Sequence, residues 1–105
     1  VILPVHFAGM PSKLDILGNL AKDHGAYLIE DAAHACGAKF NENKIGTHGD
    51  MVCFSFHPVK NLAMPSGGLV SINNPNFKKK RQKSVTDDFN SIFYVDSSYL
   101  CINCW

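Results

Sequence analysis

The sequence predicts an incomplete α/β domain with a mostly parallel β-sheet flanked by helices. Hydrophobic residues make up 46% of the 105 residues, which is enough to form a packed core. Residues 1–31 read as an apolar extended run, an amphipathic helix and a second apolar run, the order of a βαβ unit with parallel strands. Further short apolar runs bounded by turn residues supply the remaining strands of the sheet.

The first unit covers residues 1–30. Residues 1–6 are apolar and extended and begin without a cap, so we expect a strand cut out of a longer protein. Residues 12–24 carry leucines at helical spacing, with Ser12 and Asp15 in the pattern of a capping box and Gly25 where a C-terminal cap is expected. Residues 26–30 then form a buried strand, which leaves Asp31 at its carboxyl end.

The second half continues with shorter elements. Residues 40–49 are rich in turn residues and predict a hairpin or a winding loop. Strands are expected at residues 51–56 and 67–72, and a basic helix at residues 76–84. Beyond residue 86 the sequence has no clean period of either kind, so we divide the chain into a partial large domain, residues 1–85, and a divergent tail, residues 86–105.

Composition excludes several classes of protein. The formal net charge is +1, which provides no basic surface for nucleic acid or for an acidic membrane. No apolar run reaches the roughly 18 to 20 residues of a membrane span, and no leader is recognisable. The CxxC at Cys101 and Cys104 has no second pair of ligands near it, so we expect no metal site. We therefore expect a cytoplasmic protein that binds neither nucleic acid nor membrane.

Two charged residues follow predicted strands, at the sheet edge where open α/β sheets bind ligands. Asp31 either caps a turn of helix or pairs with a buried cation. Lys60 is either solvated or is held near a cofactor, where the amine can lose its proton and bond to an aldehyde.

Three other side chains have the same two interpretations. Ser55 is either structural or a hydroxyl that binds phosphate, and His34 and His57 are either packing residues or members of a site. The pair Gly67 and Gly68 has the spacing of neither a Walker loop nor a dinucleotide-binding loop. Singly these signals are weak, and their order along the chain carries the argument.

Three strings occur in a specific order: YLIEDAAHACGA at residues 27–38, KIGTHGD at 44–50 and FSFHPVK at 54–60. Together they resemble the DegT/DnrJ/StrS family of sugar aminotransferases, which depend on pyridoxal 5'-phosphate (PLP), and the similarity runs over residues 1–74. The resemblance implies part of the large domain of an aspartate-aminotransferase-like fold.

The family pattern assigns a role to four residues. It implies that Asp31 pairs with the protonated pyridine nitrogen of PLP and that His34 lies against the cofactor ring or its phenolic oxygen. It implies that Ser55 binds the cofactor phosphate and that Lys60 forms the covalent bond to the cofactor. A carboxylate beside the ring nitrogen keeps it protonated, and a lysine released from the cofactor can move a proton as a general acid and base.

The implied reaction moves an amino group from an amino acid, commonly glutamate, to a nucleotide-linked keto-sugar. The FHPVK variant resembles members that make amino sugars for surface polysaccharides, and family members work as homodimers. Two alternatives remain: a PLP-dependent sugar dehydratase of the same fold, and an inactive, degenerate fragment.

The chain departs from the family pattern after the lysine. AMPSGG at residues 63–68 replaces a Thr-Thr-Gly-Glu-Gly-Gly stretch, so Ser66 takes the place of a glutamate and Pro65 that of a glycine. Substrate handling by this loop is therefore open, as is the origin of the tail, which divergence, a frame error or an assembly artefact would each produce.

Overall fold

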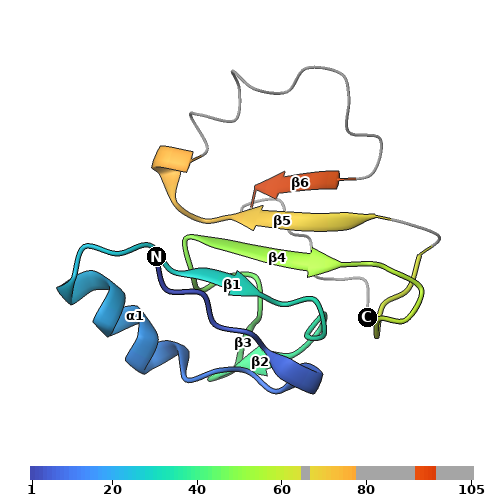
Figure 1. Ribbon diagram of the computed structural model, residues 1–105, viewed down its shortest axis with the longest axis horizontal. Helices are drawn as coiled ribbons and strands as arrows, with labels where there is room; N and C mark the ends of the chain where they lie inside the picture. The colour runs from blue at the N-terminus through green and yellow to red at the C-terminus, as the bar shows by residue number, and fades with distance from the viewer. Residues whose placement is uncertain (65–66, 78–91, 97–105) are drawn as a thin grey trace.

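A four-stranded mixed sheet organises the part of the chain that the computed structural model describes, residues 1–64, 67–77 and 92–96. Its strands are β1 (Ile29–Asp31), β4 (Met51–Ser55), β5 (Gly68–Ile72) and β6 (Ile92–Asp96), in the order β1-β4-β5-β6. The pairs β1·β4 and β5·β6 are parallel, whereas β4 and β5 are antiparallel. The arrowheads of β1 and β4 therefore point to one edge of the sheet and those of β5 and β6 to the other (Figure 1).

The predicted βαβ unit is present in outline, but isolated bridges replace its first strand. Residues 1–6 pair with the β1 region only through two parallel bridges, Ile2 with Leu28 and Val5 with Asp31. Backbone hydrogen bonds at 2.8 to 3.0 Å connect the two segments, including His6 N–H to the Asp31 carbonyl. The segment therefore extends the sheet beyond β1 in the parallel sense that the sequence predicts.

Helix α1 (Leu14–Asp23) connects these two segments and begins two residues later than predicted. The expected capping box is wrong, because Lys13 occupies the N-cap and no side chain caps the helix. Ser12 Oγ instead donates to the Val5 carbonyl at 3.1 Å, so this serine is used to fasten the strand-to-helix turn. The other end agrees with the prediction, since Gly25 has φ +58° and its N–H donates to the Lys22 carbonyl.

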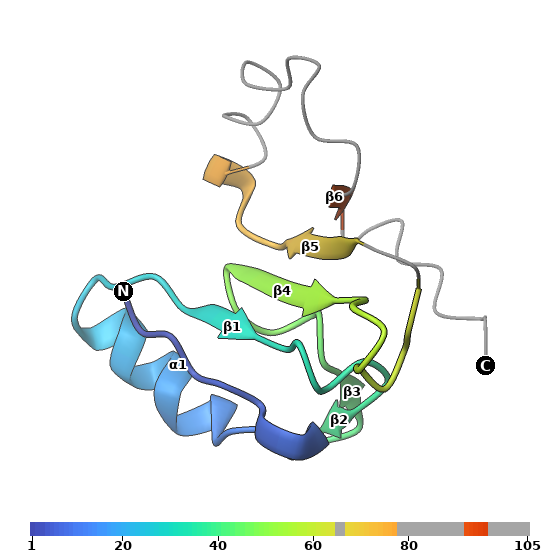
Figure 2. The ribbon, with the colours of Figure 1, turned by 45° about the vertical axis from the view of Figure 1, so that its right-hand side comes forward.

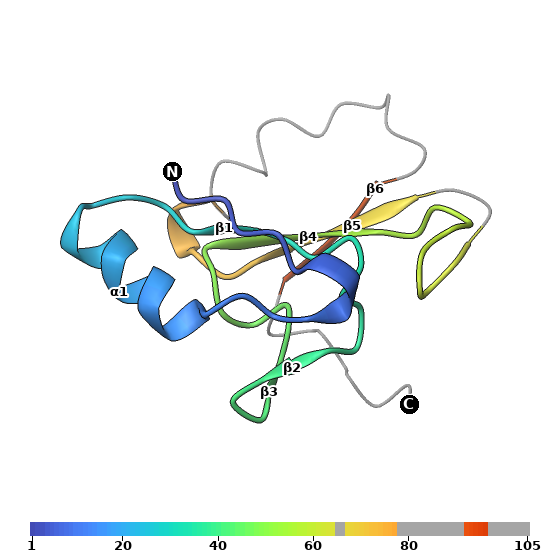
Figure 3. The ribbon, with the colours of Figure 1, turned by 60° about the horizontal axis from the view of Figure 1, so that its bottom comes forward.

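The turn-rich segment after β1 forms a hairpin of β2 (Lys39–Phe40) and β3 (Asn43–Lys44). Asn41 and Glu42 both have positive φ, at +46° and +66°, the requirement of a two-residue turn that matches strand twist. The hairpin and α1 lie on the same side of the sheet (Figures 2 and 3).

The core fills the space between the sheet and these two elements. It contains side chains from α1, from the loops around the hairpin and from alternate positions of β4. Val52 and Phe54 point into it, while Met51, Cys53 and Ser55 are only half-buried on the opposite face of the same strand. The members of the core are Leu14, Ala21, Leu28, Ala32, Ala35, Ile45, Val52, Phe54 and Phe56.

The sequence did not predict β6, which lies in the segment after residue 86 and pairs in parallel with all five residues of β5. The basic helix predicted at residues 76–84 lies largely outside the described residues. Wholly outside them lie the basic residues of 78–83, Pro65, Ser66, Cys101 and Cys104. Among the described residues no helix has the length and apolar character needed to cross a membrane.

Candidate active site

Asp31 lies at the carboxyl end of β1, where the sequence placed it. Its backbone is held on both sides: the N–H donates to the Pro4 carbonyl at 2.9 Å and the carbonyl accepts from His6. Its carboxylate Oδ1 accepts the Ala33 N–H at 3.0 Å. No α-helix is assigned at the residues that follow, so Asp31 closes a two-residue turn rather than capping a helix.

Ser55 ends the neighbouring strand on the same face as Asp31. Asp31 is the register partner of Cys53, and side chains two residues apart on a strand share a face. Burial raises the pKa of the Cys53 thiol, and the negative charge of Asp31 raises it further, in agreement with this placement. Asp31, Cys53 and Ser55 therefore form one half-buried strip across the carboxyl ends of β1 and β4.

Lys60 and His34 meet across the two loops that follow these strands. Lys60 Nζ lies 2.9 Å from His34 Nε2, although the residues are 26 positions apart. Ala8, His34, Val59, Lys60 and Asn61 line a cavity of about 270 Å³ beside this contact. The ring of Phe7 lies 5.8 Å from that of His34, so the amino-terminal segment also contributes to the site.

Short turns hold both loops in place. The His34 loop is closed by the N–H groups of Ala35 and Ala38, which donate to the carbonyls of Ala32 and Ala35. The Lys60 loop is closed by Lys60 N–H to the His57 carbonyl at 2.8 Å. His57 itself is exposed, and its N–H lies 3.4 Å from Ser55 Oγ, so it acts in the loop rather than in the cavity.

The structure thus brings two of the four predicted residues into contact and aligns the other two on one face of the sheet. An amine beside a cavity, a carboxylate at a strand end and a hydroxyl on the adjacent strand are the groups that PLP requires for its aldehyde, ring nitrogen and phosphate. The residues present therefore fit this cofactor. Among the described residues no group of three or more His, Cys, Asp or Glu side chains is arranged to hold a metal ion.

A buried polar network next to Asp31 was not predicted from the sequence. Glu30 and His6 are both fully buried and lie 2.8 Å apart through Oε2 and Nε2. The second oxygen of Glu30 accepts the N–H of Gly49, and His6 Nδ1 accepts the N–H of Ser12 at 3.1 Å. The signal was an ionisable residue in the middle of an apolar run, which is costly unless it is paired.

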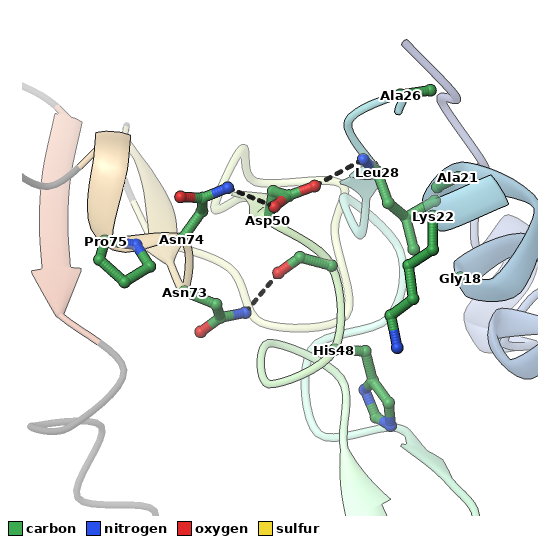
Figure 4. A pocket seen from close by; sticks show the side chains of 11 residues that line it. Gly18, Ala21, Lys22, Ala26, Leu28, His48, Asp50, Asn73, Asn74 and Pro75 are labelled. Carbon is green, nitrogen blue, oxygen red and sulfur yellow. Dashed lines mark hydrogen bonds between the residues drawn. The ribbon is translucent and has the colours of Figure 1, made fainter. Parts of the chain in front are cut away.

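A second hollow, of about 390 Å³, lies at the opposite end of the sheet and contains none of the predicted residues. Figure 4 shows Asp50, Asn73 and Asn74 on one side of it and α1 on the other. Asp50 accepts the Leu28 N–H at 2.8 Å and the Asn74 side-chain amide at 2.6 Å. These contacts join the start of β4 to the end of β5 and to the chain entering β1.

Known structures share this fold. The chain is 27% identical to the Helicobacter pylori aminotransferase PseC, which is involved in the biosynthesis of pseudoaminic acid, with a TM-score of 0.70 over 83% of this chain and 25% of PseC. It is 29% identical to the PLP form of the putative sugar aminotransferase Spr1654 from Streptococcus pneumoniae, with a TM-score of 0.60 over 64% of this chain and 21% of that one. The fold is that of part of the large domain of a PLP-dependent aminotransferase.

The family follows from the sequence. The model of the DegT/DnrJ/EryC1/StrS aminotransferase family matches residues 1–86, and the chain belongs to this family. Over 79 residues it is 46% identical to the uncharacterized protein MJ1066 of Methanocaldococcus jannaschii, a match that covers 75% of this chain and 20% of that protein. The chain thus spans about a fifth to a quarter of the length of these relatives.

Proposed function

We propose that this chain carries the cofactor-binding centre of an enzyme that transfers an amino group from an amino acid, glutamate, to a nucleotide-linked keto-sugar. The observation that carries the proposal is the 2.9 Å contact between Lys60 Nζ and His34 Nε2 beside a cavity at the carboxyl ends of β1 and β4. The product class is an amino sugar for surface polysaccharides.

Lys60 and His34 can share one proton in two ways. A lysine ammonium only donates, so while Lys60 is charged, Nε2 of His34 is the acceptor and the ring proton lies on Nδ1. A neutral amine can instead accept from a protonated Nε2. A group that takes a proton from a substrate carbon and returns it elsewhere needs both arrangements, which supports Lys60 as the general acid and base.

Asp31 and Ser55 would orient the cofactor between them. The Asp31 carboxylate suits a cationic ring nitrogen, because a nearby negative charge stabilises the protonated form. The Ser55 hydroxyl suits a phosphate oxygen as a hydrogen-bond donor. PLP, when bound, supplies the electron sink for the carbanion formed at the substrate carbon.

The relatives support the same class of chemistry. PseC is an aminotransferase involved in pseudoaminic acid biosynthesis, and Spr1654 has been solved both in a PLP form and in the form that carries the amino group, PMP. We further propose that the whole protein is a cytoplasmic homodimer, that residues 1–85 belong to its large domain, and that residues 86–105 form a divergent extension.

The experiment adds PLP to the purified full-length protein and records the visible absorption band of covalently bound cofactor. Borohydride reduction followed by peptide mass spectrometry should locate the cofactor on Lys60, and Lys60→Ala should abolish the band. Lys39→Ala, a lysine of the exposed hairpin, is the matched control and should retain it. A wild-type protein that forms no band, or a Lys60→Ala variant that keeps it, contradicts the proposal.

Transfer itself is measured with glutamate and a panel of nucleotide-linked keto-sugars. Formation of 2-oxoglutarate together with an aminated sugar nucleotide is the expected result. Cofactor binding without transfer to any member of the panel would restrict the proposal to the cofactor site.

A further inference from the structure

We propose that Asn61 is a positioning residue for Lys60, one that holds the Lys60 loop against the His34 loop whether or not Lys60 itself contacts His34. This inference rests on the proposed function. Asn61 Nδ2 donates to the Cys36 carbonyl at 2.7 Å, across 25 positions of sequence. The contact lies next to the Lys60–His34 contact, and Asn61 lines the same cavity.

Within the described part of the chain, two side-chain hydrogen bonds of different character connect the two loops. The first, Lys60 with His34, involves the amine that does the chemistry. Covalent attachment to the cofactor would change this contact, because Nζ would then carry at most one hydrogen and have a different geometry. The second, Asn61 with Cys36, uses a neutral amide and a backbone carbonyl, and neither group titrates or reacts in the proposed cycle.

The acceptor of this second contact is firmly held. Cys36 lies within a turn that is closed by the Ala38 N–H, which donates to the Ala35 carbonyl at 3.1 Å, and Ala35 is fully buried in the core. Ala32, at the start of the same loop, donates to the Cys53 carbonyl of β4 at 2.8 Å. The loop that carries the Cys36 carbonyl is therefore anchored to the sheet. The hydrogen bond from Asn61 to this carbonyl holds the Lys60 loop at a fixed place relative to the His34 loop.

Among the described residues, Leu62 packs the Lys60 loop against the core, while the backbone hydrogen bonds inside the loop are local. Lys60 N–H reaches the His57 carbonyl and Met64 N–H reaches the Phe56 carbonyl, both at 2.8 Å and both within the loop. These bonds set the shape of the loop but not its place relative to His34. Apolar packing by Leu62 sets no direction, whereas the hydrogen bond of Asn61 adds a directional constraint, so that the released amine stays where it can take up the substrate proton.

The test measures covalent attachment of PLP to Lys60 in the full-length protein, a condensation that releases one water. The first-order rate constant of band formation at saturating PLP reports how the amine is placed, and the half-saturating PLP concentration reports reversible binding. We expect Asn61→Ala to lower the rate constant about threefold to tenfold, the range one net hydrogen bond can contribute, with half-saturation nearly unchanged. Asn61→Asp has a side chain of equal size without the N–H donor, and it should lower the rate constant at least as much.

Two controls separate positioning from general damage. Asn19→Ala makes the same chemical change on the exposed face of α1 and should leave the rate constant unchanged. Without cofactor, hydrogen exchange in residues 57–64 should accelerate in Asn61→Ala, while exchange in the hairpin stays constant. This second measurement tests the contact even where the variant binds PLP poorly.

The outcomes are distinguishable from those that concern the function. Wild-type protein that never attaches PLP overturns the proposed function and this inference with it. Wild-type protein that attaches PLP, with Asn61→Ala reacting equally fast, overturns only the role of Asn61. The role of Asn61 is also overturned if Asn61→Ala changes only the half-saturating PLP concentration. It is likewise overturned if Asn19→Ala lowers the rate constant by the same factor.

Discussion

His6 donates a hydrogen bond from Nε2 to the carboxylate of Glu30, and both side chains are fully buried. The direction follows from the other ring nitrogen: Nδ1 accepts the Ser12 N–H, so it carries no hydrogen and the ring proton lies on Nε2. Glu30 in turn accepts from Gly49. One carboxylate therefore connects the amino-terminal segment, β1 and the loop that enters β4.

Replacing this carboxylate by an amide should destabilise the protein. In Glu30→Gln one of the two donors, His6 or Gly49, faces an NH2 group, and a buried donor left unpaired costs about 1 to 3 kcal/mol. Thermal or denaturant unfolding measures the loss. Glu42→Gln is the control, because Glu42 is exposed and its pairing with Lys39 at 3.8 Å lies at the surface, so no measurable change is expected. Equal stability of the two variants would contradict this account of the network.

Two glycine-to-alanine changes should act in opposite directions. A Cβ at Gly49 would lie 2.7 Å from the Glu30 carboxylate and 2.8 Å from the Leu28 carbonyl, so Gly49→Ala forces a shift of buried groups that costs about 1 to 3 kcal/mol. A Cβ at Gly18, inside α1, meets nothing within 4 Å, and Gly18→Ala should stabilise by about 0.5 to 1 kcal/mol. Unfolding midpoints that shift in the same direction would be inconsistent with the described packing.

Asp50 should be structural rather than catalytic. Its carboxylate receives the Leu28 N–H and the Asn74 amide at the far end of the sheet (Figure 4). In Asp50→Asn one of these donors faces an NH2 group and loses its acceptor, which should lower the free energy of unfolding by about 1 to 3 kcal/mol. Attachment of PLP to Lys60 should persist in the folded variant. Asp23→Asn, at the exposed end of α1, should leave the unfolding midpoint unchanged.

The reactivity of Cys53 should report the charge of Asp31. Burial is the larger cause of the raised thiol pKa and Asp31 is the second, so Asp31→Asn should lower that pKa and increase the thiolate fraction at any pH below it. Alkylation of Cys53, followed by peptide mass spectrometry across a pH series, should accelerate. Cys36 serves as an internal reference, since its raised pKa reflects burial opposed by Lys44 and does not involve Asp31. An unchanged Cys53 rate would show that the two side chains are farther apart than the register indicates.

Local patterns predicted the elements that are set by neighbouring residues. The leucine spacing of α1, the glycine after it and the apolar runs of β4 and β5 need only short-range information, and the structure confirms them within about two residues. The ordered strings likewise predicted that Lys60 and His34 share a site, and the 2.9 Å contact is consistent with that.

Features set by distant partners escaped the sequence analysis. Ser12 has the spacing of a cap, yet its hydroxyl finds the Val5 carbonyl because the preceding turn brings that group closer. The sequence analysis gave Glu30 no partner, because His6 and Gly49, which bond to its carboxylate, lie 24 and 19 positions away. Strand β6 has no period of its own and is defined by its pairing with β5.

The register of β4 determines which of its side chains share a face with Asp31. It is hydrogen-bonded to β1 on one edge and to β5 on the other, with Asp31 opposite Cys53 and Gly68 opposite Ser55. A slip by one residue would exchange the two faces of the strand, sending Ser55 into the core and turning Phe54 toward the face that carries Asp31. Because β4 pairs on both edges, such a slip would break its hydrogen bonds to β1 and also those to β5. The register of β4 therefore keeps a hydroxyl, and not a phenyl ring, on the same face as Asp31.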